Sequence, residues 1–95
     1  MPIGSSGKLK PLKSAQIRAA RALIRWSAAE LASEAALGLA TIKRAELAKG
    51  ETSMTMANDL AVRRALEAAG VEFIDENGGG PGVRLRHRPR RPKSP

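Results

Sequence analysis

The 95-residue sequence contains no cysteine and no tyrosine, and only one tryptophan, one phenylalanine and one histidine. The absence of cysteine excludes disulfides and thiolate metal sites, which fits a reducing cytoplasm. No apolar run approaches the roughly 20 residues of a membrane span. The first residues, MPIGSSGKLKPLK, also lack the apolar block of a signal peptide. We therefore expect a cytoplasmic protein that makes no contact with the membrane.

Groups suited to catalysis, metal binding or cofactor binding are also scarce. The one histidine, His87, has no partner for metal binding or catalysis. The stretch GSSGK is not a phosphate loop, because Gly4 and Gly7 have the wrong separation and Leu9 stands where Ser or Thr is needed. No nucleophile–base pair and no ligand cluster emerges. We expect no enzymatic activity, no metal ion and no cofactor.

The net charge of +8 is concentrated near the C-terminal end. Residues 84–95 hold six of the 17 basic residues and no acid, which leaves 11 basic against 9 acidic residues in positions 1–83. Polyanions are the natural partners of such a segment, nucleic acid ahead of an anionic membrane. The last nine residues, 87–95, include three prolines and are expected to form a disordered basic tail.

The rest of the sequence predicts a mostly α-helical domain with a short C-terminal β-hairpin or strand pair. Residues 1–13 are rich in Gly, Ser, Pro and Lys and are expected to form a flexible arm. Apolar residues at helical spacing, with caps before them and glycines after them, predict helices at about 14–25, 28–36, 39–48 and 55–69. VEFID and VRLR, on either side of GGGPG, predict strands at about 71–75 and 83–86.

Four residues are the expected caps: Ser14 for the first helix, Ser27 for the second, and Thr55 or Ser53 for the fourth. Ser27 has the clearest surroundings, because Glu30 lies three residues on and completes a capping box. Trp26 and Leu31 have the spacing of a hydrophobic staple. We therefore expect Trp26 to fill core, and we favour this over stacking on a nucleobase.

The stretch WSxxELAxxAxLxxATIxRxE resembles the helix-turn-helix of the lambda-repressor-like family, the Cro-type bacterial regulators. The matching residues are Trp26, Ser27, Glu30, Leu31, Ala32, Ala35, Leu37, Ala40, Thr41, Ile42, Arg44 and Glu46, followed by Gly50. The resemblance covers residues 14–69 and implies a domain of four to five helices. It implies a homodimeric transcriptional regulator that binds specific double-stranded DNA, with helix 39–49 in the major groove. Such a protein would associate with the nucleoid.

The same stretch has a consistent physical interpretation. Ala32 and Ala35 are small where two helices must cross closely, Leu37 anchors the turn, and Ile42 locks the second helix against the first. Glu30 and Glu46 are explained by capping and by structural pairing.

The resemblance implies DNA contacts from Leu39, Ala40, Thr41, Lys43 and Arg44, and from Ser27 and Ala28 at the start of the preceding helix. Several positions depart from the family's pattern: Ala36 replaces a usual glycine, Gly38 a polar cap, and Ala28 a glutamine that often touches phosphate. Leu39 and Ala40 stand where polar residues are frequent, although both can contact thymine methyls. We therefore expect Thr41, Lys43 and Arg44 to make most polar contacts. A solvated surface is expected for Arg63 and Arg64.

The predicted strands, in the segment 70–86, carry the apolar residues Val71, Phe73, Ile74, Val83 and Leu85. A lone two-stranded hairpin is marginal in water, so these residues need another surface to cover them. We expect the strands to pair across a two-fold axis as a dimerisation element. Packing on the fourth helix of the same chain is the alternative.

Two further functions stay open from the sequence. One is an antitoxin-type protein-interaction module that also binds operator DNA. The other is a non-specific nucleic-acid binder led by the basic tail. The capping box, turn and second helix argue against the latter, because a polycation needs none of them.

Overall fold

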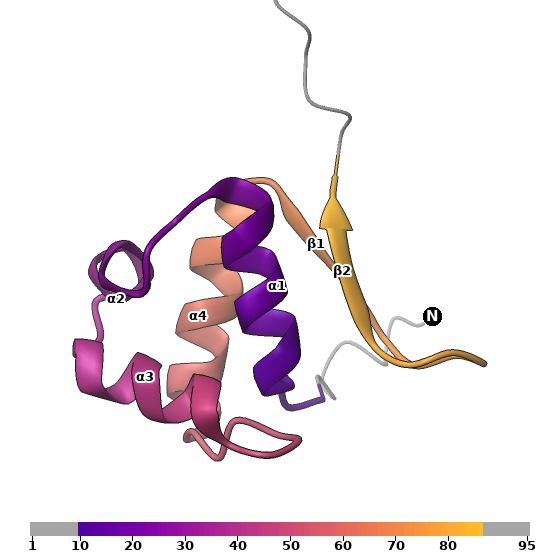
Figure 1. The fold of residues 1–95 in the computed structure, drawn as a ribbon, viewed down its shortest axis with the longest axis horizontal. Helices are drawn as coiled ribbons and strands as arrows, with labels where there is room; N and C mark the ends of the chain where they lie inside the picture. The colour runs from indigo at the N-terminus through magenta and orange to yellow at the C-terminus, as the bar shows by residue number, and fades with distance from the viewer. Residues whose placement is uncertain (1–9, 87–95) are drawn as a thin grey trace, which may run out of the picture.

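The computed structural model describes residues 10–86 and contains four helices followed by a two-stranded antiparallel sheet (Figure 1). The helices are α1 (Ser14–Ile24), α2 (Ala28–Ala35), α3 (Leu39–Leu47) and α4 (Met56–Ala68); the strands are β1 (Val71–Ile74) and β2 (Gly82–Leu85). The prediction of a mostly helical domain with a C-terminal strand pair is confirmed. The predicted tail, 87–95, and residues 1–9 of the predicted arm lie outside the described residues.

The predicted arm, residues 1–13, extends too far along the chain. Leu12 is fully buried in the core, and its backbone N–H donates to Asp59 Oδ2 of α4 at 2.9 Å. Lys13 forms an isolated antiparallel bridge with Glu51. The Pro- and Lys-rich composition of this segment predicted a flexible arm, although Leu12 is a core residue. The folded domain therefore begins before residue 13.

The core consists of aliphatic side chains, as the shortage of aromatic residues requires. Its buried members are Leu12, Ile17, Ala20, Leu31, Ala32, Ala35, Ile42, Val62, Leu66 and Val71. Trp26 and Leu37 are half-buried and pack against this cluster, which confirms the positions expected for them. Met56, the first residue of α4, is 81% exposed, because it precedes the part of that helix that reaches the core.

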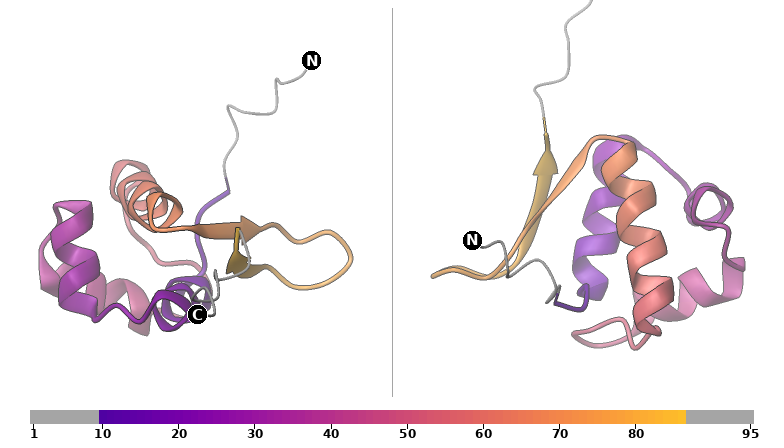
Figure 2. Two further views of the ribbon diagram at one scale, coloured as in Figure 1. Left: turned by 90° about the horizontal axis from the view of Figure 1, so that it is seen from above. Right: turned by 180° about the vertical axis from the view of Figure 1, so that it is seen from behind.

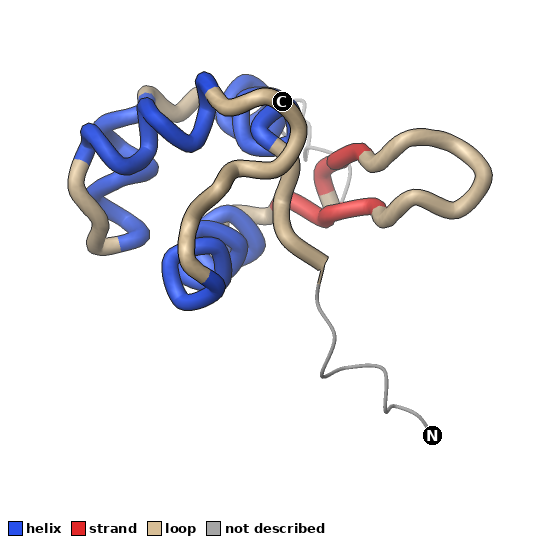
Figure 3. Tube along the Cα trace, turned by 90° about the horizontal axis from the view of Figure 1, so that it is seen from below, coloured by secondary structure: helices blue, strands red, loops and turns tan. Residues whose placement is uncertain are grey.

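The α2–α3 pair and the hairpin occupy opposite ends of the described domain. The domain measures 47 Å along its longest axis, with the α2–α3 pair at one end and the β1–β2 hairpin at the other (Figures 1 and 2). Helices α1 and α4 lie between them: α1 contacts α3 and both strands, and α4 contacts α2 and β1. The loop that joins the strands projects away from the helices (Figure 3).

A short turn, residues 36–38, joins α2 to α3. Ala36 ends α2 in the left-handed conformation, with φ 59° and ψ 41°. The N–H of Ala36 bonds to the carbonyl of Ser33 at 3.1 Å, and the N–H of Leu37 bonds to that of Ala32 at 2.9 Å. This way of closing a helix usually employs glycine, because L-residues strain in the left-handed region. The strained residue of the turn is therefore an alanine.

Two of the expected caps are confirmed and one is wrong. Ser27 Oγ accepts from the N–H of Glu30 at 3.0 Å, and the N–H of Ser27 donates to Glu30 Oε1 at 2.6 Å. Thr55 Oγ1 accepts from the N–H of Asn58 at 3.1 Å. Ser14, however, lies inside α1 and is buried, because its hydroxyl is engaged with α3.

The hairpin covers its apolar face with its own chain. The register pairs Val71 with Leu85 and Phe73 with Val83, which places these four side chains on one face of the sheet. Val71 is fully buried, and Phe73 and Val83 pack against the core. The alternative interpretation therefore holds for these three residues, whose side chains do not form a free dimer surface.

The other two predicted dimer residues, Ile74 and Leu85, are half-buried. The opposite side of the sheet, which carries Glu72 and Arg84, holds an ion pair, with Arg84 Nε 3.1 Å from Glu72 Oε1.

Candidate nucleic-acid interface

Helix α3 has one exposed side and one buried side. At about 100° per residue, five side chains fall within an arc of about 140°. These five, which we call the outer face, are all exposed or nearly so: Leu39, Ala40, Lys43, Arg44 and Leu47. On the opposite side Ile42, Ala45 and Glu46 are buried. The helix therefore presents a single surface to a partner.

The outer face changes character along the helix. Its first turn carries Leu39, which is 39% exposed, and Ala40. Its second turn carries the cations Lys43 and Arg44, and its end carries Leu47, which is 82% exposed. No acidic residue lies on this face, because Glu46, the only acid of α3, points inward. The surface combines positive charge with exposed apolar groups.

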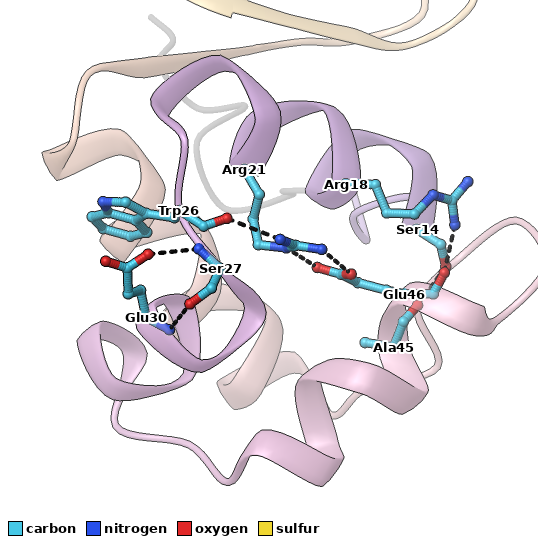
Figure 4. A network of polar contacts seen from close by, with 8 residues as sticks. All are labelled: Ser14, Arg18, Arg21, Trp26, Ser27, Glu30, Ala45 and Glu46. Atoms are coloured by element: carbon cyan, nitrogen blue, oxygen red, sulfur yellow. Dashed lines mark hydrogen bonds and ion pairs between the residues drawn. The ribbon is translucent and has the colours of Figure 1, made fainter.

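Side chains from α1 hold the end of α3 in place (Figure 4). The last carbonyls of a helix have no partner within it. Ser14 Oγ donates to the carbonyl of Ala45 at 2.6 Å, and Arg18 Nη1 donates to the carbonyl of Glu46. Two carbonyls of the last turn are thus satisfied from the neighbouring helix.

A partly buried ion pair adds to this attachment. Arg21 of α1 contacts both carboxylate oxygens of Glu46, with Nε 2.6 Å from Oε2 and Nη2 2.8 Å from Oε1. The hydrogen bond to Glu46 raises the pKa of the Arg21 guanidinium. Arg21 Nη1 also donates to the carbonyl of Trp26 at 2.9 Å, just before α2 (Figure 4). The structural pairing expected for Glu46 is confirmed. Through Arg21, it connects α1, α3 and the segment before α2.

The residues predicted at the start of α2 contribute less than expected. Ser27 is exposed, and its hydroxyl keeps a hydrogen to donate because the capping bond uses only a lone pair. The carboxylate of Glu30 lies beside it, however, and would repel a phosphate. The methyl group of Ala28 packs against the core. Of Ala28, only the backbone N–H could therefore serve a ligand.

Thr41 lies apart from the outer face. It is half-buried and lines a hollow of about 500 Å³ between α3, the following loop and the start of α4. Arg44, Leu47, Thr55 and Asn58 also line this hollow. Of the five residues predicted on this helix, four therefore share the outer face, and Arg44 borders both surfaces.

Leu47 is the outer-face residue that the predicted contacts omitted. The structure exposes Leu47 and buries the next residue, Ala48, in part. The signal was present, because Leu47 lies four residues after Lys43 and three after Arg44, and both separations return to the same face of a helix.

Arg63 is not the solvated charge that we expected. Its Cζ lies 4.9 Å from the centre of the Phe73 ring, and its Nη1 is 3.8 Å from Glu67 Oε2. Its Nη2 also donates to the carbonyl of Lys10 at 3.4 Å. Arg63 therefore joins α4, β1 and the N-terminal segment, whereas Arg64 is exposed as expected.

Neither a metal site nor a membrane-spanning helix is present in the part of the chain that the structure describes. There, no group of three or more His, Asp or Glu side chains could hold a metal ion. None of the four helices is long and apolar enough to cross a bilayer. No protein-family model and no curated protein matches the chain. A functional assignment therefore rests on the residues and geometry of the domain itself.

Proposed function

We propose that this protein is a sequence-specific double-stranded DNA-binding transcriptional regulator of the lambda-repressor-like type, with α3 in the major groove. The main support is the outer face of α3, where two cations and no acid lie on a helix whose other side is fixed to the domain. A major groove admits one α-helix, and side chains on the exposed face reach the base edges. The short turn after α2 agrees with the resemblance noted from the sequence.

The test is capture of genomic DNA fragments by the purified full-length protein, followed by footprinting on the most enriched fragment. We expect a protected site with a defined sequence and two-fold symmetry. Enrichment that follows only fragment length or charge would contradict sequence-specific binding.

We further propose that the protein binds as a homodimer, because one short helix reads too few base pairs for useful specificity. The hairpin is a candidate contact, since each strand of a two-stranded sheet has an unpaired edge. It lies at the opposite end of the 47 Å domain from α3 (Figure 1). A dimer in which two domains lie end to end, joined through their hairpins, would place the two α3 helices farther apart than the roughly 34 Å of one DNA turn.

The spacing of the half-sites in the footprint therefore identifies the dimer contact. Half-sites separated by two or more turns agree with hairpin pairing. Half-sites one turn apart require a contact nearer to α3. A footprint that covers a single half-site, from a protein that sediments as a monomer, would contradict the homodimer.

An antitoxin-type module is a second candidate, favoured by the exposure of Leu47 and Met56, at 82% and 81%. Leu47 ends α3 and Met56 begins α4, so they stand at the two ends of one loop, and exposed apolar patches are typical of protein contacts. The discriminating observation is a neighbouring gene for a small toxin whose product co-purifies with this protein. Replacing both residues by serine should then abolish co-purification.

A further inference from the structure

We infer that the first turn of α3 distinguishes bases by the presence of a C5-methyl group, and so accepts 5-methylcytosine in place of thymine. This inference rests on the proposed function. It specifies the chemical feature of the DNA that the outer face recognises.

On the outer face, the first turn of α3 offers no polar side chain to a base, because Thr41 lies apart from that face and lines the hollow. Leu39 is 39% exposed and Ala40 is exposed. Gly38, which precedes them, makes no side-chain cap. The nearest outer-face donors, Lys43 and Arg44, belong to the next turn. A base pair that meets this part of the outer face therefore meets only apolar side chains.

Such groups cannot read a hydrogen-bond pattern. In the major groove the four base pairs differ in their donors and acceptors, and thymine also presents a C5-methyl group. Leu39 and Ala40 have neither donors nor acceptors in their side chains, so a methyl group is the one feature that they can favour. 5-Methylcytosine carries its methyl group at the same ring position. We therefore expect both methylated pyrimidines to bind alike at these positions.

Charge complementarity makes DNA the occupant of this apolar surface. Lys43 and Arg44 follow Leu39 and Ala40 on the same side of the helix, and no acid is present there. A polyanion drawn to the second turn brings its base edges to the first. An apolar peptide would gain nothing from the two cations.

The experiment measures the affinity of the unmodified protein for duplexes that vary one half-site position at a time. Each thymine is replaced in turn by uracil, by 5-methylcytosine paired with guanine, and by cytosine paired with guanine. At one or two positions we expect thymine and 5-methylcytosine to bind equally, and uracil and cytosine about fourfold more weakly, the effect of one buried methyl group. If the helix recognised the base by hydrogen bonds, thymine and uracil would instead bind with equal affinity, because their donors and acceptors are the same.

A matched pair of variants assigns the effect to the helix. Leu39→Ala should remove most of the difference between thymine and uracil. Leu23→Ala is the control, because Leu23 on α1 is 40% exposed, almost the same as Leu39, and lies off the outer face. It should leave the difference unchanged. Thermal melts establish that both variants are folded.

The outcomes separate this inference from the proposed function. If a specific site is bound and every thymine can be replaced by uracil without loss, methyl recognition is wrong and the proposed function stands. If no sequence is preferred, the proposed function fails and this inference fails with it. The base series uses the unmodified protein, so the result does not depend on how the variants fold.

Discussion

Replacing Ala36 by glycine is expected to stabilise the domain, although the same change within α1 is expected to destabilise it. Ala36 closes α2 with φ 59° and ψ 41°. Its side chain is exposed, so its removal takes no apolar group from the core. Both turn hydrogen bonds are made by the backbone and are kept. In the folded state, the substitution therefore changes only the conformational energy of the backbone at residue 36.

The magnitude follows from two opposing contributions. The left-handed conformation costs an L-residue about 1–2 kcal/mol, which glycine avoids. Glycine also increases the conformational entropy of the unfolded chain, which costs about 0.4–1 kcal/mol of stability. The net gain is about 0.5–1 kcal/mol, or a rise of about 2–8 °C in melting temperature for a domain of this size.

The assay is a thermal melt followed by circular dichroism, with Ala19→Gly as the control. Ala19 is exposed in the middle of α1, where glycine costs about 1 kcal/mol relative to alanine. We expect the two substitutions to shift the melting temperature in opposite directions. A fall for both variants would refute the left-handed assignment of Ala36.

Three further predictions concern DNA binding and the N-terminal segment. Arg44→Ala should weaken operator binding by about 1–3 kcal/mol and relax preference at one base pair; equal weakening on all sequences would make Arg44 a phosphate contact. Asp59→Ala should lower the free energy of unfolding in urea by about 2–4 kcal/mol, because the buried N–H of Leu12 and the Thr52 hydroxyl both lose their acceptor. Asp59→Asn should cost less, and equal losses would contradict this account. Cutting the chain after Arg86 removes four cations and should flatten the salt dependence by roughly 0.9 in log–log slope per lost phosphate contact, with an unchanged preferred sequence; identical slopes would make the tail irrelevant to binding.

Local signals were enough to predict the elements. The capping box at Ser27, the cap at Thr55 and the glycine-rich turn each act within a few residues, and the structure places element boundaries close to them. Caps and turns depend on backbone geometry that is the same in any fold, so the sequence is sufficient to predict them. The outer face of α3 was predicted in another way, because the resemblance to a helix-turn-helix implied four of its five residues.

Contacts between distant residues were not predictable in this way. Leu12 is part of the core because Asp59, 47 residues away, takes up its N–H. Arg63 is held by the Phe73 ring of a strand whose position the sequence does not specify. Val71 is likewise buried without a partner chain, because α1 and α4 of the same chain contact strand β1. Each error arose from judging a segment without the surface that meets it.

The orientation of α3 depends on residues outside the stretch that resembles a helix-turn-helix. Ser14, Arg18 and Arg21 follow one another at helical spacing along α1, and all three bind Ala45 or Glu46 near the end of α3 (Figure 4). Binding at that end fixes both the tilt of α3 and its rotation about its own axis. Because side chains on a helix turn with it, that rotation decides which of them can reach a base edge. In the proposed complex with DNA, the specificity of the outer face would therefore be set jointly by its own residues and by these three donors on α1.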